Sequence, residues 1–224
     1  MSESVAQSGA AEIELQGERL LLLPERAIGW PARRTLIIAD PHFGKDDIFR
    51  RAGIALPRGP AIADLQRLTK LLDRHAIERL LILGDFVHGA TRSGDSFLHA
   101  FALWRQAHPR VAVIVIAGNH DRVEARSKWT GSVEWWTEPC IDPPFVFVHE
   151  PEVMDSGYVV SGHIHPVVRL TAPTTTVRVP VFWIRPRYLV LPSYGSFTGG
   201  ARIDPEPEDR LYAAAPERVI PLSR

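Results

Sequence analysis

Residue types that bind divalent metal ions gather at the ends of five short apolar runs in the sequence. They are Asp40, His42, Asp85, His88, Asn119, His120, Asp121, His149, His163 and His165. A mixture of carboxylate and imidazole suits Mn, Fe or Zn, whereas Mg and Ca prefer ligand sets made of oxygen alone. The set is too large for one ion and suits two, which can clamp the attacking and leaving oxygens of a phosphoryl displacement.

Two of these groups have a spacing that aims two side chains at one place. One residue separates Asp40 from His42, and one residue separates His163 from His165. Alternate side chains of an extended chain point the same way, so each pair can offer two ligands to one ion. A lone His-x-His is more often an ordinary surface pair, so the interpretation depends on all five groups together.

Residues 118–121, Gly-Asn-His-Asp, directly follow the unbroken apolar run 111–116, which is typical of a buried strand. They mark the point where a rigid strand passes into a loop, a common location for catalytic residues. Amide, imidazole and carboxylate groups are costly to bury without partners. We expect Asn119 to face a metal ion, His120 to face a substrate, and Asp121 to hold His120 in place.

The elements that must position these groups alternate between strand and helix patterns. Buried strands are predicted at 35–39, 80–83 and 111–116, and helices at 46–53, from 61 onward and at 95–106. The second helix has an apolar face of helical spacing, made of Ile62, Leu65, Leu68, Leu71 and Leu72. Three repeats of strand, polar group and helix indicate a mainly parallel sheet, whose carboxyl edge holds the site.

The rest of the chain has strand patterns without helices between them. The strand-like runs lie at 145–148, 158–160, 167–170, 177–184 and 188–191. They predict a second, more antiparallel sheet. A hairpin or two short strands are expected over 12–23, and residues 1–11 are expected to be disordered because they are small and polar. The prediction is therefore one domain over 12–224.

Bulk composition narrows the class of protein. Of 224 residues, 26 are Lys or Arg and 26 are Asp or Glu, so no global basic field attracts nucleic acid. The single cysteine, Cys140, excludes an internal disulfide framework, fits a reducing compartment and is expected to pack in the interior. The chain shows neither a signal-peptide pattern nor an apolar run long enough to span a bilayer. We expect a soluble cytoplasmic protein with no membrane partner.

The five polar groups together resemble the pattern of the calcineurin-like metallophosphoesterase superfamily. That pattern is D-x-H, G-D, G-N-H-D, H and G-H-x-H, and residues 40–42, 84–85, 118–121, 149 and 162–165 match it in order. The resemblance implies an α/β fold, a four-layer αββα sandwich of two mixed β-sheets flanked by helices. It also implies a phosphoesterase with two divalent metal ions as cofactors, Mn(2+) foremost, with Fe, Zn or Ni as alternatives.

The resemblance also implies a division of labour. One ion would be bound by Asp40, His42 and His165. The other ion would be bound by Asn119, His149 and His163, and Asp85 would bridge the two ions. His120 is similar to the family's catalytic histidine, which donates a hydrogen bond or proton to the phosphoryl group or leaving oxygen. Asp121 would fix its orientation. His88 resembles a second histidine of the nuclease branch, with a substrate-side or supporting role.

Two stretches, 39–59 and 182–200, resemble a narrower branch, the bacterial ligase-associated metallophosphoesterases called PdeM. This likeness implies a DNA-repair endonuclease, with DNA as its partner and a DNA ligase and a helicase as companions. The alternatives are a small-molecule phosphatase or nucleotide pyrophosphohydrolase, and a non-catalytic scaffold of the same fold. The short segment between Asp121 and His149 leaves little room for a cap, which favours an open site.

Three other sets of residues have both a binding and a structural interpretation: Lys45, Arg50 and Arg51; Trp129, Trp135 and Trp136; and Lys128, Arg185 and Arg187. The first set would bind phosphate beside the site or lie on a solvated helix face. The tryptophans would stack on bases or, as the favoured use, pack in the core. The third set would bind a DNA backbone, which the neutral net charge disfavours. Residues 197–200 are a loop over the site or a plain turn.

Overall fold

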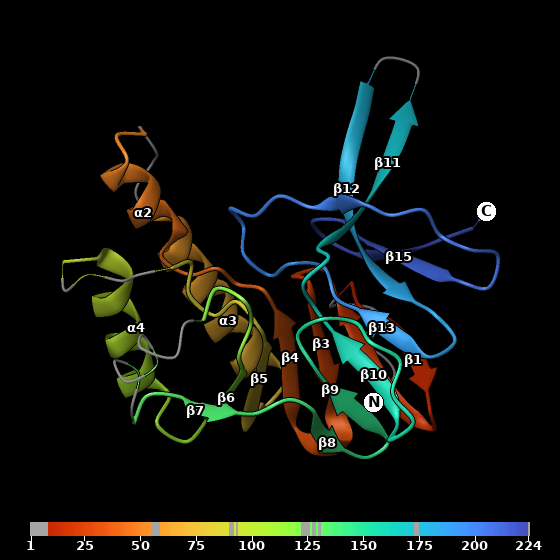
Figure 1. The fold of residues 1–224 in the computed structure, drawn as a ribbon, viewed down its shortest axis with the longest axis horizontal. Helices are drawn as coiled ribbons and strands as arrows, with labels where there is room; N and C mark the ends of the chain where they lie inside the picture. Colours follow the sequence, from red (N-terminus) through yellow and green to blue (C-terminus); the bar gives the residue numbers. More distant parts are fainter. Residues whose placement is uncertain are drawn as a thin grey trace.

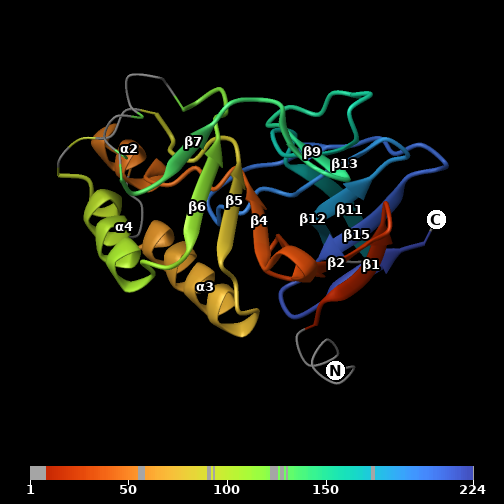
Figure 2. The same cartoon turned by 90° about the horizontal axis from the view of Figure 1, so that it is seen from below.

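The computed structural model describes residues 9–54, 59–89, 92, 94–121, 126, 129, 131–172 and 175–223. The described chain forms two mixed β-sheets that pack face to face (Figures 1 and 2). Ordered structure begins earlier than predicted, because the first strand starts at Ala11 and the carbonyl of Gly9 accepts a hydrogen bond from Val219 N. Residues 1–8 lie outside the described residues. None of the described helices is long and apolar enough to cross a membrane.

The first sheet has seven strands in sequence order. They are β1 (Ala11–Leu15), β2 (Glu18–Leu23), β3 (Ala27–Trp30), β4 (Thr35–Ala39), β5 (Arg79–Leu83), β6 (Ala112–Ile116) and β7 (Glu134–Trp136). The pairs from β1 to β4 are antiparallel, and those from β4 to β7 are parallel. The predicted hairpin and the three predicted buried strands are confirmed. β3 and β7 were not predicted, since each is short and neither alternates clearly between polar and apolar residues.

Two helices, α3 (Pro60–Arg74) and α4 (Ser96–Ala107), cover the outer face of the parallel half of this sheet (Figure 2). The described chain also has α2 (Lys45–Arg51) and a short 3-10 helix, η1 (Pro31–Arg33). The predicted apolar face of α3 is buried except at Ile62, which is 41% exposed in the first turn, beside the groove between α3 and α4. Trp129 packs on Phe86 and Phe101 in the core, so its structural interpretation is confirmed.

The second sheet is assembled from the later strands. They are β8 (Cys140–Asp142), β9 (Phe145–Phe147), β10 (Tyr158–Ser161), β11 (Pro166–Ala172), β12 (Thr175–Ile184), β13 (Tyr188–Val190), β14 (Ala201–Arg202), β15 (Arg210–Ala214) and β16 (Val219–Leu222). β10 lies parallel to both β9 and β13, whereas β12 is antiparallel to its three neighbours. The β11–β12 hairpin projects from the body as a long arm (Figure 1).

One of the two large cores lies between the sheets, and the other lies between the first sheet and its helices. Ile37, Leu81 and Ile114 of the first sheet belong to the same buried cluster as Phe147 and Phe182 of the second. Each buried side chain of this size stabilises the fold by about 1.5–3 kcal/mol. Buried Cys140 belongs to this cluster too, which confirms its packing role.

Two mixed sheets with helices packed against them confirm the predicted α/β sandwich, while the outer face of the second sheet is covered differently from that of the first. In the described part of the chain it carries two small apolar clusters and no α-helix. The connection from β9 to β10 contains Pro151 and ends at Gly157, so it forms an irregular loop and not a covering helix. Loops therefore supply the fourth layer on this side.

Candidate active site

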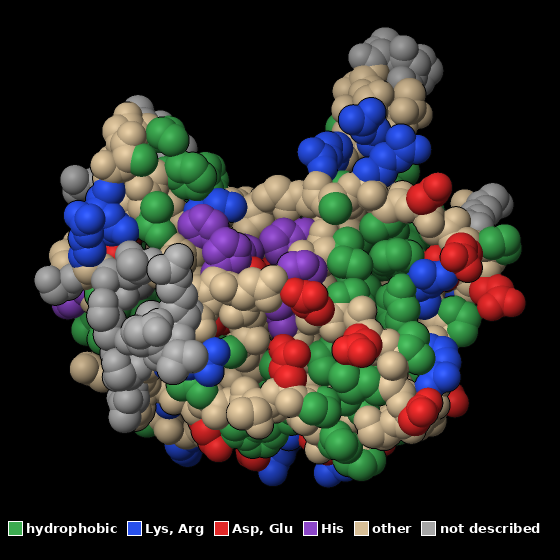
Figure 3. All heavy atoms as spheres, viewed as in Figure 1, with side chains coloured by type: hydrophobic (Ala, Val, Ile, Leu, Met, Phe, Trp, Pro, Cys, Tyr) green, Lys and Arg blue, Asp and Glu red, His purple; other side chains and the backbone are tan. Residues whose placement is uncertain are grey.

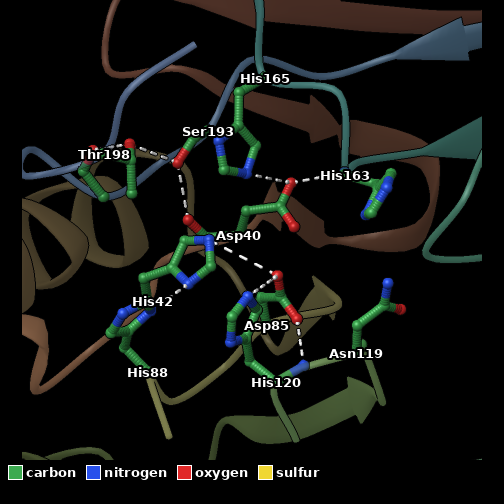
Figure 4. A network of polar contacts seen from close by, with 12 residues as sticks. Asp40, His42, Asp85, His88, Asn119, His120, His163, His165, Ser193 and Thr198 are labelled. Carbon is green, nitrogen blue, oxygen red and sulfur yellow. Dashed lines mark hydrogen bonds and ion pairs between the residues drawn. The ribbon is translucent and has the colours of Figure 1, made fainter. Parts of the chain in front are cut away.

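Parallel strands of both sheets bring the predicted residues to one rim of the molecule (Figure 4). Asp40, Asp85 and Asn119 follow β4, β5 and β6, while His149 and His163 follow β9 and β10. The carboxyl ends of parallel strands meet at the same edge of a sheet. The packing of two sheets thus joins two such edges into one cluster.

Ligand atoms in this cluster approach one another closely enough to share cations. In three sets, one ligand atom from each residue lies within 4.8 Å of those of the other two: Asp40, His42 and His165; Asp40, Asp85 and His149; and His42, His88 and His120. Asp40 Oδ2 lies 3.5 Å from His165 Nε2, and Asp85 Oδ2 lies 3.5 Å from His42 Nε2. The two carboxylates therefore occupy the centre, with imidazoles around them.

Buried polar atoms without a hydrogen-bond partner indicate that the cluster fits a cation. Asp40 is fully buried, yet its Oδ1 has no hydrogen-bond partner among the described residues, and the same holds for His149 Nδ1 and His165 Nε2. Buried polar groups are normally satisfied, so three orphans in one place indicate a missing partner of positive charge. Burial, reinforced by the neighbouring His165 and His88, lowers the pKa of His42 to about 2. This imidazole is thus neutral at pH 7, as metal ligation requires.

The backbone at the site is held in an unusual conformation. Asp40, His42, Asp85, His163 and His165 all have φ between 44° and 67°, a left-handed region that residues with a side chain rarely adopt. Such conformations persist only where the surroundings enforce them. Here the loops hold one another, since Asp85 O accepts from His42 N at 2.9 Å and Asp40 Oδ2 accepts from His163 N at 2.8 Å.

Two motif glycines allow the carboxylates and imidazoles to approach the backbone. A Cβ at Gly84 would lie 1.7 Å from His149 Nδ1, and a Cβ at Gly162 would lie 2.5 Å from Asp40 Oδ2. Both distances are far below a van der Waals contact. These glycines of the G-D and G-H-x-H groups are therefore required by packing against the site.

Asp121 has a different role from the predicted one. Its carboxylate accepts hydrogen bonds from the backbone amides of Phe86, Val87 and Gly118 at 3.0–3.1 Å. Burial raises its pKa, which these three bonds oppose. In the described structure no hydrogen bond joins its carboxylate to the His120 ring. Asp121 therefore ties the loop after β5 to the loop after β6, and it positions His120 only through the backbone.

His120 and His88 form a stacked pair that faces the solvent side of the cluster. Their ring centroids are 5.0 Å apart, and the His120 side chain is 49% exposed. His120 N donates to Asp85 Oδ1 at 2.9 Å, which anchors the residue while its ring stays accessible. His88 Nδ1 lies 3.2 Å from His42 Nδ1, and burial, with the charge of Lys45, lowers the pKa of His88 to about 4. Figure 3 shows the histidines on the floor of a hollow between α2 and the β11–β12 hairpin.

Asn119 and His163 stand apart from the three sets above. Both approach Glu150, which accepts a hydrogen bond from Asn119 Nδ2 at 2.9 Å and lies 3.8 Å from His163 Nε2. His163 Nδ1 also lies 3.1 Å from His149 Nε2. With its nitrogen bound to Glu150, the Asn119 amide has its carbonyl oxygen left for a cation. Glu150 was not predicted, although its place directly after His149 was a usable signal.

Ser193 is a second residue that the sequence interpretation missed. Its buried hydroxyl donates to the carbonyl of Asp40 at 2.7 Å and lies 2.6 Å from the Thr198 hydroxyl (Figure 4). Ser193 follows β13, a strand parallel to β10, so it obeys the same strand-end rule as the ligands. The loop 197–200 reaches the site through this contact and is more than a plain turn.

The predicted phosphate-binding residues divide into two kinds. Lys45, at the start of α2, is half-buried near His42 and His88, whose pKa values its charge lowers. Arg50 pairs with Asp46 at 3.1 Å and with Asp47, while Arg51 pairs with Asp95. These ion pairs give the two arginines a structural function in α2.

The patch predicted from Lys128, Arg185 and Arg187 is not formed by its described members. Arg185 pairs with Glu206 at 2.9 Å and with Asp209 at 3.1 Å, and Arg187 pairs with Asp155. Acidic partners offset both positive charges. Lys128 lies outside the described residues.

Comparisons with known proteins agree with this geometry. Residues 33–172 match the family model of the calcineurin-like phosphoesterases. The chain belongs to this family. It is a metal-dependent phosphoesterase, as the residues of its site indicate. The crystal structure of the nuclease MPE from Pseudomonas putida is similar, with 39% identity and a TM-score of 0.82 over 95% of this chain and 100% of that one.

A protein of unknown function from Aquifex aeolicus, AQ665, is 20% identical over 52% of this chain and 60% of its own. Its TM-score of 0.38 is too low to carry an argument. A comparison with curated proteins finds no significant match.

Proposed function

We propose that the protein is a phosphodiesterase that cleaves DNA internally. The observation that carries this proposal is the open site. The side chains of His120 and His163 are 49% and 39% exposed, and histidines form the floor of the hollow seen in Figure 3. A hollow open at its rim admits a polymer, whereas a phosphatase for small molecules encloses most of its ligand. The likeness to a nuclease over almost the whole chain supports the same choice.

The residues of the site have separate tasks in this reaction. Asp40, His42 and His165 would hold one cation, and Asn119, His149 and His163 the other, with Asp85 between them; this list follows the family pattern. Two bound cations supply Lewis-acid stabilisation of the phosphoryl oxygens and lower the pKa of water. His120, exposed and anchored through its backbone, donates a proton or hydrogen bond to the leaving oxygen. His88 supports the His120 ring by stacking on it.

We further propose a DNA-repair setting for this activity. The segments 39–59 and 182–200 support it, because they resemble the ligase-associated branch of the family. In this setting the enzyme is cytoplasmic, uses Mn²⁺, and acts beside a DNA ligase and a helicase. Pull-down of the tagged protein from cells under DNA damage tests the association: co-recovery of both enzymes supports it, and their absence under crosslinking contradicts it.

A parallel assay tests the proposed reaction. Metal-stripped protein receives Mn²⁺ and is given bis-p-nitrophenyl phosphate, p-nitrophenyl phosphate, and circular single-stranded DNA, which has no ends. We expect the diester and the circle to be cleaved, and the monoester to be hydrolysed far more slowly. Preference for the monoester would indicate a phosphatase. No hydrolysis of any substrate with Mn²⁺, Ni²⁺ or Zn²⁺ would contradict the enzyme assignment altogether.

A further inference from the structure

One long segment of the chain contains arginines but no acidic residue, although the whole chain has no net charge. Between Asp155 and Asp204 there is no Asp or Glu, whereas this interval contains five arginines. Two of them, Arg185 and Arg187, are neutralised by the ion pairs described above. The other three, Arg169, Arg178 and Arg202, have no acidic partner among the residues that the structure describes.

Strand register places these three arginines on one face of the sheet at the base of the β11–β12 arm, where β14 pairs with β11. Arg169 of β11 is directly opposite Arg178 of β12. Val167, two positions before Arg169, pairs with Pro180 on one side and with Arg202 of β14 on the other. Directly paired residues share a face of a sheet, and so do residues two apart along a strand. The three guanidinium groups therefore project from the same face.

This arginine face opens toward the active site. A cavity of about 280 Å³ is lined by Val167, Arg178 and Pro180 from this face, and by His165, one of the predicted ligands. Arg26 and Thr198 complete other walls of the same cavity. The space-filling view shows basic side chains gathered at the base of the arm, beside the histidines (Figure 3). The basic face and the cluster are thus parts of one continuous surface.

The arrangement is unfavourable without an anion. Like charges directly opposite each other in a sheet destabilise the pair, and Arg169 and Arg178 are such a pair. Both are exposed, as is Arg202, so ordered solvent-facing positive charge is available to a ligand. Guanidinium groups bind phosphate oxygens in a bidentate manner, which suits a chain of phosphodiesters.

We propose that Arg169, Arg178 and Arg202 bind the phosphates of the DNA strand that flanks the scissile bond. This inference rests on the proposed function, and it assigns the β11–β12 arm as the surface that guides the strand to the cluster. Lys45 lies on the α2 side of the hollow, so the strand would pass between two basic borders. The small diester bis-p-nitrophenyl phosphate has a single phosphate, so it offers these arginines no flanking phosphates to bind.

The test compares two triple variants with equal change in charge. One carries Arg169→Gln, Arg178→Gln and Arg202→Gln. The control carries Arg19→Gln, Arg34→Gln and Arg187→Gln, which lose exposed ion pairs elsewhere. Each protein is assayed with Mn²⁺ on a fluorescent single-stranded 20-mer over a range of KCl, and on bis-p-nitrophenyl phosphate. Circular dichroism verifies folding, and the double variant Arg169→Gln, Arg202→Gln replaces the triple if that protein does not fold.

We expect the arm variant to lose about tenfold in kcat/KM on the 20-mer relative to the small diester, mainly through KM, because it has lost contacts to the phosphates of the strand. Each lost contact should also reduce the slope of log affinity against log salt concentration by about 0.7. The control variant should match the wild type on both substrates. An arm variant whose substrate ratio and salt slope equal the control's would overturn the inference. Wild-type hydrolysis of the small diester without cleavage of the 20-mer would refute the proposed DNA substrate and, with it, this inference. Wild-type inactivity on both substrates would instead refute the proposed function.

Discussion

The two halves of the predicted cation site lie in unequal surroundings. In the first half, Asp40 is fully buried and the side chains of His42 and His165 are 5% and 17% exposed. In the second half His149 is buried, but Asn119 is exposed and the His163 side chain is 39% exposed. The first half is held by backbone bonds between loops, whereas Asn119 is held by a single exposed carboxylate, that of Glu150.

The difference shows how one ligand set can bind two cations with unequal strength. Buried ligands have their geometry fixed before the cation arrives. They also exclude water, which strengthens the electrostatic attraction between the carboxylate and the cation. Exposed ligand side chains, such as those of Asn119 and His163, must be ordered when the cation binds, which costs side-chain entropy. We infer that the first half binds its cation more tightly, and that the second cation is the one lost on dilution.

Asp85→Ala should have the largest effect, because this carboxylate lies between both halves. Its oxygens are 3.5 Å from His42 Nε2 and 3.8 Å from His149 Nε2. We expect loss of both cations and of all measurable activity, seen by elemental analysis after dialysis and by the diester assay. Near-normal metal content in a folded variant would refute the bridging role. Glu134→Ala, an exposed substitution on β7, serves as the control.

His120→Ala should leave both halves intact and still lose most of the turnover. General acid catalysis contributes about 10²–10⁴-fold to rate, and no other described residue places an exposed imidazole against Asp85 in the same way. The check is DNA cleavage together with metal content of the same preparation. A variant with wild-type cleavage would remove His120 from the mechanism. The loss should be smaller on bis-p-nitrophenyl phosphate, whose nitrophenolate leaving group needs little protonation.

Asn119→Ala should separate the halves. It removes an amide from the second half and touches none of the buried ligands of the first. We expect one cation to stay bound after dialysis. The Mn²⁺ concentration needed to fill the second position should rise by about 10–100-fold, the range found when partners of a metal site are removed. Equal weakening of both cations would show that the halves are not independent.

Glu150→Ala should have the smallest effect of the four. It leaves every predicted ligand in place and removes the carboxylate that accepts from Asn119 Nδ2 and lies 3.8 Å from His163 Nε2. We expect the second cation to bind about tenfold more weakly, within the range found for outer partners of metal ligands. The Mn²⁺ dependence of diester hydrolysis measures this shift. The control Glu152→Ala, two residues further along, should leave the Mn²⁺ dependence unchanged.

The gathering of the candidate ligands could be predicted because each of their buried strands ends in a polar group, a signal that is local in sequence. The roles of Asp121, Glu150 and Ser193 could not be predicted from the sequence. They depend on which backbone amide, side chain or carbonyl the fold places beside each of these residues. Asp121 shows this best: its carboxylate binds amides of residues 86 and 87, more than thirty positions earlier in the chain. Register, which places the three arginines of the arm on one face, is equally invisible in the sequence.

Calorimetric titration of the metal-free protein with Mn²⁺ tests the central claim most directly. Unequal halves predict two bound ions per chain in two resolved steps, with the weaker step alone shifted in Asn119→Ala and both steps absent in Asp85→Ala. A single ion per chain, or two ions of equal affinity that both weaken in Asn119→Ala, would contradict the account.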